Sequence, residues 1–144
     1  MSRHTVRRYM TLAPFVVGSR CTLAEAHQRM RERRIRHLPV VDDGRLVGIV
    51  SQRDLYLLET LRSVDATSET VAEAMTPDPF TASPDAPLDE VARRMAEHRY
   101  GSAVIVEDGK VIGVFTTVDA LQALATVLRR GRAVLSPRLG SRPA

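Results

Sequence analysis

Apolar and polar positions follow the same order twice along the chain. In each half, a segment with helical spacing precedes two short apolar runs joined by a turn, and a second helical segment follows. The predicted helices span residues 23–34, 52–62, 88–99 and 117–129, and the predicted strands span 38–41, 45–50, 103–106 and 110–115. This pattern indicates a mixed α/β (α+β) fold in which helices cover an apolar sheet in each half.

The first helix of each half has a recognisable start. Thr22 and Asp85 are expected to begin these helices, because both residue types are favoured at helix N-termini. Glu25 and Glu90 follow in the first turn, where a carboxylate interacts favourably with the helix dipole. Extended, proline-marked segments lead into the two helices, at residues 11–22 and 76–87.

The two halves are copies of each other. A shift of 65 positions carries Gly48 onto Gly113 and Asp54 onto Asp119 without a gap. Such a repeat predicts that each copy is one supersecondary unit that buries its apolar face against the other, with two equivalent clefts related by a pseudo-twofold axis. The expected divisions are copy one at 6–62, a polar linker at 63–70, copy two at 71–129 and a flexible Arg/Pro-rich tail at 130–144.

Composition limits the class of protein. The 144 residues are 44% hydrophobic and 26% charged, as in an ordinary globular chain. No apolar run approaches the roughly 18 residues that span a bilayer, so no membrane association is expected. A single cysteine, Cys21, makes a reducing cytoplasm the expected location.

The positive charge is almost entirely arginine. The net charge is +4, and Lys110 is the only lysine. Part of the arginine lies near the two ends of the chain, which leaves nucleic-acid binding open as a weaker alternative. The end arginines are Arg3, Arg7, Arg8, Arg129, Arg130, Arg132, Arg138 and Arg142.

The most specific local motif is glycine, two apolar residues, a hydroxyl residue, two further residues and aspartate. It occurs as Gly48 to Asp54, with Ser51, and again as Gly113 to Asp119, with Thr116. A hydroxyl and a carboxylate in this spacing can form a capping box at a helix start. In a cleft, the same pair can bind a nucleotide, with the carboxylate accepting the ribose hydroxyls and the helix N-terminus favouring phosphate. The repetition of the motif favours the second interpretation.

Other chemistry has little support in the sequence. The histidines, together with Cys21, show no zinc-site spacing, so no metal site is expected. There is no nucleophile elbow, so no catalytic residues are expected either. The histidines are His4, His27, His37 and His98.

These motifs, over residues 6–128, resemble a tandem pair of CBS (cystathionine-β-synthase) domains, a Bateman module. The resemblance rests on the paired Met-Thr…Pro-Phe segments, on the segment 35–42 and on the two glycine-to-aspartate motifs. It implies two β-α-β-β-α units packed with pseudo-twofold symmetry, and a homodimer. It also implies a regulatory, non-catalytic module with clefts for AMP, ADP, ATP or S-adenosylmethionine as effectors and no obligatory cofactor.

Each cleft should contain residues of both copies, and the resemblance assigns residues to each. For the Asp54 cleft they are Arg36, His37, Ser51, Arg53, Asp54, Thr76, Asp78 and the backbone of Phe80. For the Asp119 cleft they are Met10, Ala13, Phe15, Gly101, Ser102, Thr116 and Asp119. Because Arg36, His37 and Arg53 carry the cationic groups, the Asp54 cleft is expected to bind phosphorylated adenosine more tightly.

The leading hypothesis is a free-standing adenine-nucleotide sensor that acts on an unidentified partner protein in trans. A ligand-independent dimerisation or scaffold module is the alternative, in which the serine or threonine and the aspartate are only helix caps. For the homodimer, the helices 23–34 and 88–99 could form the contact, with Met30 and Met95 repacking against a second copy. The same methionines serve equally well as internal core.

Overall fold

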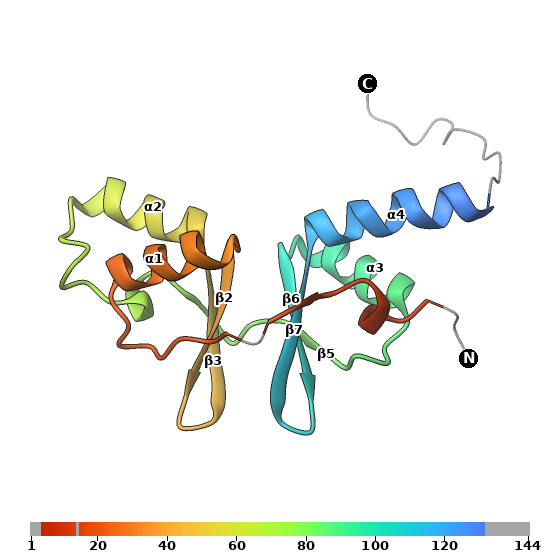
Figure 1. The fold of residues 1–144 in the computed structure, drawn as a ribbon, viewed down its shortest axis with the longest axis horizontal. Helices are drawn as coiled ribbons and strands as arrows, with labels where there is room; N and C mark the ends of the chain where they lie inside the picture. The colour runs from red at the N-terminus through yellow and green to blue at the C-terminus, as the bar shows by residue number, and fades with distance from the viewer. Residues whose placement is uncertain (1–3, 14, 132–144) are drawn as a thin grey trace.

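A computed structural model describes residues 4–13 and 15–131; residues 1–3, Pro14 and the tail residues 132–144 lie outside this description. The chain forms two α/β halves whose hairpins lie side by side at the centre, with the helices towards the outside (Figure 1). In chain order the elements are η1 (Val6–Arg8), β1 (Thr11–Leu12), α1 (Leu23–Arg33), β2 (His37–Asp42), β3 (Arg45–Ser51), α2 (Gln52–Arg62), η2 (Val71–Glu73), β4 (Thr76–Pro77), β5 (Thr81–Ala82), α3 (Leu88–His98), β6 (Ser102–Glu107), β7 (Lys110–Thr116) and α4 (Thr117–Gly131). This confirms the predicted fold class.

One of the two predicted helix starts is correct. Thr22 caps α1, because its side chain accepts a hydrogen bond from the amide of Glu25 at 3.1 Å. Asp85 does not begin α3; the N-cap residue is Pro87, which has an extended backbone and forms a bridge with Thr5. This bridge keeps the chain extended past Asp85, so that the helix begins only at Leu88.

The two copies exchange their N-terminal segments. Strand β1 of copy one pairs with β7 of copy two, with Thr11 opposite Val114. Strand β4 of copy two pairs with β3 of copy one, with Thr76 opposite Ile49. The strand orders are therefore β1-β7-β6-β5 in one sheet and β2-β3-β4 in the other.

The glycine of each motif permits this exchange. A Cβ atom on Gly113 would lie 2.7 Å from the sulfur of Met10 and 2.9 Å from the carbonyl oxygen of Thr11. A Cβ atom on Gly48 would lie 2.5 Å from the sulfur of Met75. Only a residue without a side chain allows the incoming segment to approach each hairpin so closely.

The hydrophobic cores follow the exchanged segments. Val71, from the start of copy two, is buried in the core of copy one, and Val6 is buried in the core of copy two. A third cluster, built around Ile49, Val104 and Val114, joins the two sheets at the seam between the copies. The halves therefore share their packing across this seam.

The first helices do not offer their methionines to a second copy. Met30 is 1% exposed and Met95 is 4% exposed, and both belong to internal cores. The sequence left open whether these methionines contact a second copy or belong to the internal core, and the structure places them in the internal core. Their helical spacing places them on the face that packs against the sheet.

The space between α3 and α4 in copy two is less completely filled by side chains than the space between α1 and α2 in copy one. Leu55 of α2 is fully buried, whereas the equivalent residue of α4 is Ala120. Ala120 and Ala123 line an apolar cavity of about 450 Å³ between α3 and α4. The smaller side chains of copy two therefore leave space that leucines occupy in copy one.

Candidate functional site

The second motif holds a buried carboxylate at the start of α4. Asp119 is 7% exposed, and its Oδ2 accepts a hydrogen bond from the amide of Thr116 at 2.9 Å. The amide of Asp119 donates in turn to Oγ1 of Thr116 at 3.3 Å. This reciprocal pair satisfies free amides of the helix start, as a capping box does.

Copy one contributes a further contact to this carboxylate. The hydroxyl of Thr11 donates to Oδ1 of Asp119 at 2.9 Å. The exchange of β1 brings Thr11 there, because β1 pairs with the strand that ends at Thr116. The carboxylate is therefore held by groups from both copies.

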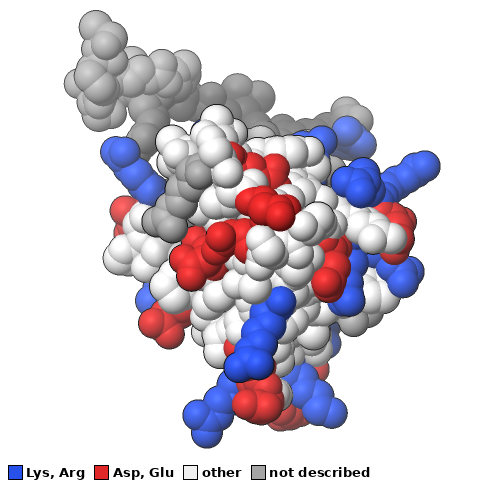
Figure 2. Space-filling model, turned by 90° about the vertical axis from the view of Figure 1, so that its left-hand side faces the viewer, with Lys and Arg blue, Asp and Glu red and all other residues white. Residues whose placement is uncertain are grey.

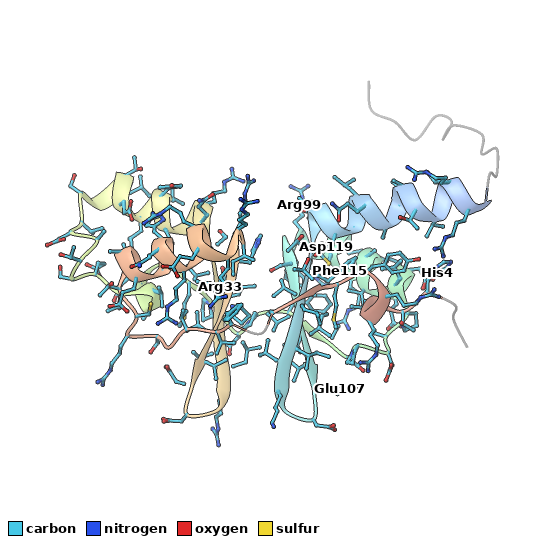
Figure 3. All side chains as sticks on the ribbon, viewed as in Figure 1. His4, Arg33, Arg99, Glu107, Phe115 and Asp119 are labelled. Atoms are coloured by element: carbon cyan, nitrogen blue, oxygen red, sulfur yellow. The ribbon has the colours of Figure 1, made fainter. Side chains whose placement is uncertain are left out.

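A cavity of about 610 Å³, the Asp119 cleft, opens beside this carboxylate. Figure 3 shows Arg33 and Asp119 on opposite sides of the central seam between the copies. Both residues line the cleft. The residues that line the cleft are Thr11, Leu12, Ala13, Phe15, Arg33, Arg34, Ile35, Arg36, His37, Val114, Thr116, Val118, Asp119 and Gln122. Its volume is in the range of small-molecule sites in proteins.

Arg36 and His37 line the Asp119 cleft, which differs from their expected place beside Asp54. The backbone at this point does lie near the first motif, because the amide of Gln52 donates to the carbonyl oxygen of Arg36 at 2.9 Å. The start of β2 nevertheless lies at the seam, where these residues form part of the wall of the opposite cleft. The cationic wall therefore belongs to Asp119.

His37 lies in the electrostatic field of both motif aspartates. Burial lowers the pKa of its imidazole, while the carboxylates of Asp54 and Asp119 act in the opposite direction. The net lowering means that desolvation outweighs the two carboxylates. The imidazole of His37 is therefore influenced by both motif carboxylates.

The residues expected around Asp119 separate into two groups. Ala13, Phe15, Thr116 and Asp119 line the cleft. The remaining three lie elsewhere: Met10 packs against the core of copy two, Gly101 lines a separate cavity between α3 and α4, and Ser102 pairs with Thr116 within the sheet.

The sequence reasoning missed two arginines of the cleft. Arg33 and Arg34 immediately precede the 35–42 segment on which the family resemblance rests. Their position next to that segment could have indicated a place in the cleft. However, solvated arginines are also common at the C-terminal end of a helix. The guanidinium of Arg33 lies 3.8 Å from the centre of the Phe15 ring, so these two side chains form one wall.

The first motif has the same cap but a different neighbourhood. The amide of Ser51 donates to Oδ2 of Asp54 at 2.9 Å, and the amide of Asp54 donates to Oγ of Ser51 at 3.0 Å. Thr76 lies beside β3, but among the described residues it makes no hydrogen bond to Asp54. Arg53 is exposed on the first turn of α2.

Asp78 and Phe80 lie on the segment that leads into α3. Asp78 has a left-handed backbone (φ 47°), and its amide donates to the carbonyl oxygen of Val47. The carbonyl oxygen of Phe80 accepts from the amide of Val104 at 2.8 Å, so the sheet already uses this backbone group. The Phe80 ring stacks on Tyr100, with the ring centres 5.0 Å apart.

Neither a metal cluster nor a membrane span is found within residues 4–13 and 15–131. No group of three or more His, Cys, Asp or Glu side chains there has a metal-binding arrangement. No helix in this part of the chain is long and apolar enough to cross a bilayer.

Both copies match a known family model, that of the CBS domain, over residues 6–58 and 71–126. This chain belongs to the CBS domain family. The matched ranges end close to the ends of α2 and α4 and so correspond to the two copies.

Solved CBS domain pairs share this fold. The CBS domain pair of protein MJ0100, in complex with 5'-methylthioadenosine and S-adenosyl-L-methionine, has a TM-score of 0.75 and 28% identity, covering 86% of this chain and 98% of that chain. CBSX2 of Arabidopsis thaliana, in complex with AMP, has a TM-score of 0.72 and 29% identity, covering 86% and 98%. Adenosine compounds are thus ligands of similar CBS domain pairs.

Curated relatives are often much longer proteins. The A-adding tRNA nucleotidyltransferase of Aquifex aeolicus is 34% identical over 126 residues, which cover 87% of this chain and 15% of that protein. Over four such relatives, the matched region spans between 15% and 36% of their length. The similarity therefore concerns a CBS module and not the activity of the larger proteins.

Proposed function

We propose that this protein is a regulatory adenine-nucleotide sensor that acts on a partner protein in trans and carries out no catalysis. AMP, ADP, ATP and S-adenosylmethionine are the candidate effectors. The observation that carries the proposal is the Asp119 cleft, which joins a carboxylate at a helix start with Arg36 and His37 across the seam. Similar CBS domain pairs with adenosine ligands support the class of ligand.

The cleft offers matching groups for each part of such a ligand. Asp119 would accept hydrogen bonds from the ribose hydroxyls, and the start of α4 together with Thr116 would favour phosphate. Arginine guanidinium groups form charge-assisted hydrogen bonds with phosphate oxygens. Arg36 would supply this contact and the His37 ring a further N–H donor, so that the Asp119 cleft, and not the Asp54 cleft, binds phosphorylated adenosine more tightly.

Isothermal titration with AMP and with adenosine tests this assignment. An Arg36→Ala variant should bind AMP at least about tenfold more weakly, since one charge-assisted hydrogen bond contributes roughly 1.5–3 kcal/mol. Its affinity for adenosine, which has no phosphate, should stay within about twofold of the original. Arg53→Ala is the matched control, because Arg53 lies on α2 beside the other motif. A loss of AMP affinity in Arg53→Ala but not in Arg36→Ala would refute the assignment.

A ligand-independent dimerisation module remains the second candidate, and two observations favour it. In both motifs the hydroxyl residue and the aspartate form reciprocal capping interactions. Large apolar side chains are also exposed on the second helix of each copy: Tyr56, Leu57 and Leu61 on α2, and Val118, Leu121, Leu124 and Leu128 on α4. We therefore expect a homodimer to use α2 and α4. A ligand-independent module would show no thermal stabilisation with any adenosine compound, whereas a ligand at 100 times its Kd adds about 2.7 kcal/mol.

Nucleic-acid binding has less support. The face in Figure 2 carries Lys and Arg side chains interspersed with Asp and Glu, without a continuous basic surface. Most of the arginine-rich tail at 130–144 lies outside the described residues. Retention on DNA or RNA that is lost with rising salt would bring this alternative forward.

A further inference from the structure

The two clefts are built on the same plan but hold different side chains. Thr11 lies opposite Val114 beside the Asp119 motif, and Thr76 lies opposite Ile49 beside the Asp54 motif. These pairs coincide under the repeat shift of 65 positions. Each residue that lines the Asp119 cleft therefore has a defined counterpart in the other copy.

Three side chains form one side of the open cleft. Phe15, Arg33 and Ile35 all line the cavity of about 610 Å³. The guanidinium of Arg33 lies over Phe15, 3.8 Å from the ring centre, and Ile35 provides an apolar surface.

Their counterparts around Asp54 are all aromatic and are stacked on one another. Phe80, His98 and Tyr100 replace Phe15, Arg33 and Ile35. The ring centres of Phe80 and Tyr100 are 5.0 Å apart with 27° between their planes. Those of His98 and Tyr100 are 5.1 Å apart with 18° between their planes. Both separations are typical of favourable aromatic pairs.

We infer that Tyr100 closes the apolar part of the Asp54 cleft, so that the chain binds one adenosine ligand and not two. The inference rests on the proposed function, since it assigns the ligand to the Asp119 cleft. Tyr100 stacks on Phe80, the counterpart of Phe15, and the guanidinium of Arg94 lies 5.2 Å from the centre of the same ring, so Phe80 already has planar partners. Tyr100 is 40% exposed and is therefore not part of the buried core.

The polar side chains of the Asp54 cleft point to the same stoichiometry. Gly101 and Ser102 replace Arg36 and His37, and Asp78 replaces Ala13. The exchange removes Arg36 and His37 as phosphate donors and adds a carboxylate, while Arg53 on the exposed first turn of α2 stands where the Asp119 cleft has Val118. A phosphorylated ligand would thus meet stacked aromatic rings and fewer phosphate donors at the start of β6.

Exchanging Tyr100 for its counterpart tests the inference. Adenosine is the probe, because without a phosphate it reports only on the base and ribose parts of each cleft. Equilibrium dialysis should give one adenosine per chain for the original protein and for Tyr100→Phe, which retains the ring. Tyr100→Ile should give two per chain, and adding Asp54→Asn to it should return the number to one.

The outcomes separate this inference from the proposed function. Two adenosines per original chain, or one per Tyr100→Ile chain with an unchanged unfolding transition, would overturn the role of Tyr100 and leave the sensor function in place. No bound adenosine or AMP in the original protein would overturn both. Loss of the single site on Asp54→Asn, with Asp119→Asn unaffected, would show that the ligand occupies the cleft that we describe as closed.

Discussion

The hydroxyl of Thr11 donates a hydrogen bond to Oδ1 of Asp119 at 2.9 Å, between residues 108 positions apart in the chain. This contact joins the N-terminal segment of copy one to the motif of copy two. It depends on the pairing of β1 with β7. The geometry of the candidate ligand site is therefore a consequence of the exchange of segments between the copies.

Removing this hydrogen bond should weaken both the fold and the site. In Thr11→Val, one oxygen of a nearly buried carboxylate loses its partner, so the free energy of unfolding in urea should fall by about 1 kcal/mol. AMP affinity should fall with it, because Asp119 is no longer oriented. Thr76→Val is the control, since among the described residues Thr76 makes no such bond to Asp54. Equal losses in the two variants would contradict the assigned role of Thr11.

A methyl group at Gly113 should displace β1. The added Cβ would lie 2.7 Å from the sulfur of Met10 and 2.9 Å from the carbonyl oxygen of Thr11, and the backbone atom has little freedom to move. We expect Gly113→Ala to lower the free energy of unfolding by about 1–3 kcal/mol and to weaken AMP binding. Gly101→Ala, where no atom lies within 4 Å of the added Cβ, should leave both quantities unchanged. An unchanged free energy of unfolding in Gly113→Ala would contradict the close approach of β1 to Gly113.

His37 should make stability depend on pH. Burial lowers the pKa of its imidazole from the ordinary value of 6.5, with partial opposition from Asp54 and Asp119. The unfolded chain therefore takes up a proton at a higher pH than the folded protein, so stability declines as the pH falls below about 6.5. Urea denaturation at pH 7.5 and 5.5 should show a smaller decline for His37→Gln than for the original protein. An identical decline in both would exclude His37 as the source.

The contact between α1 and α2 contains a polar pair that copy two lacks. Nε2 of His27, which is 8% exposed, lies 2.7 Å from Oε1 of Glu59. Glu59→Ala leaves the buried imidazole without this partner and should cost about 1–3 kcal/mol of stability. Copy two has Ala92 and Leu124 at the equivalent positions. The double variant His27→Ala/Glu59→Leu should therefore recover most of the loss in thermal and urea unfolding. If it is no more stable than Glu59→Ala, the polar pair is not responsible.

Filling the cavity between α3 and α4 should stabilise the protein. Ala123 lines this cavity of about 450 Å³, and its equivalent in copy one is Leu58. Ala123→Leu should raise the free energy of unfolding by about 0.5–2 kcal/mol, a typical gain for cavity filling. Ala125→Leu provides a control for helix propensity, because Ala125 is exposed on the same helix. A similar gain in both variants would indicate that propensity, and not the cavity, is the cause.

The sequence alone determined the local elements. Helix α2 spans Gln52–Arg62, in agreement with its prediction. The strands β2 and β6 exceed their predicted ranges by one residue at both ends, and β3 and β7 by one residue at the C-terminal end. Such elements are specified by the spacing of apolar residues and by helix caps, which depend only on residues close together in the sequence. The Ser51 and Thr116 motifs are recognisable in the sequence for the same reason, because the hydroxyl residue and the aspartate lie three residues apart at one helix start.

Tertiary structure decided which copy supplies each wall of a cleft. Because the copies have similar sequences, a strand such as β1 could satisfy its backbone hydrogen bonds on either hairpin, and no local pattern distinguishes the two. Packing of Val6 into the core of copy two, and the close approach at Gly113, fix the choice. The position of Arg36 and His37 at the Asp119 cleft, and the stacking of Tyr100 on Phe80, depend equally on contacts between distant segments. The sequence therefore specified which groups are present, and only the packed seam determined which of them meet.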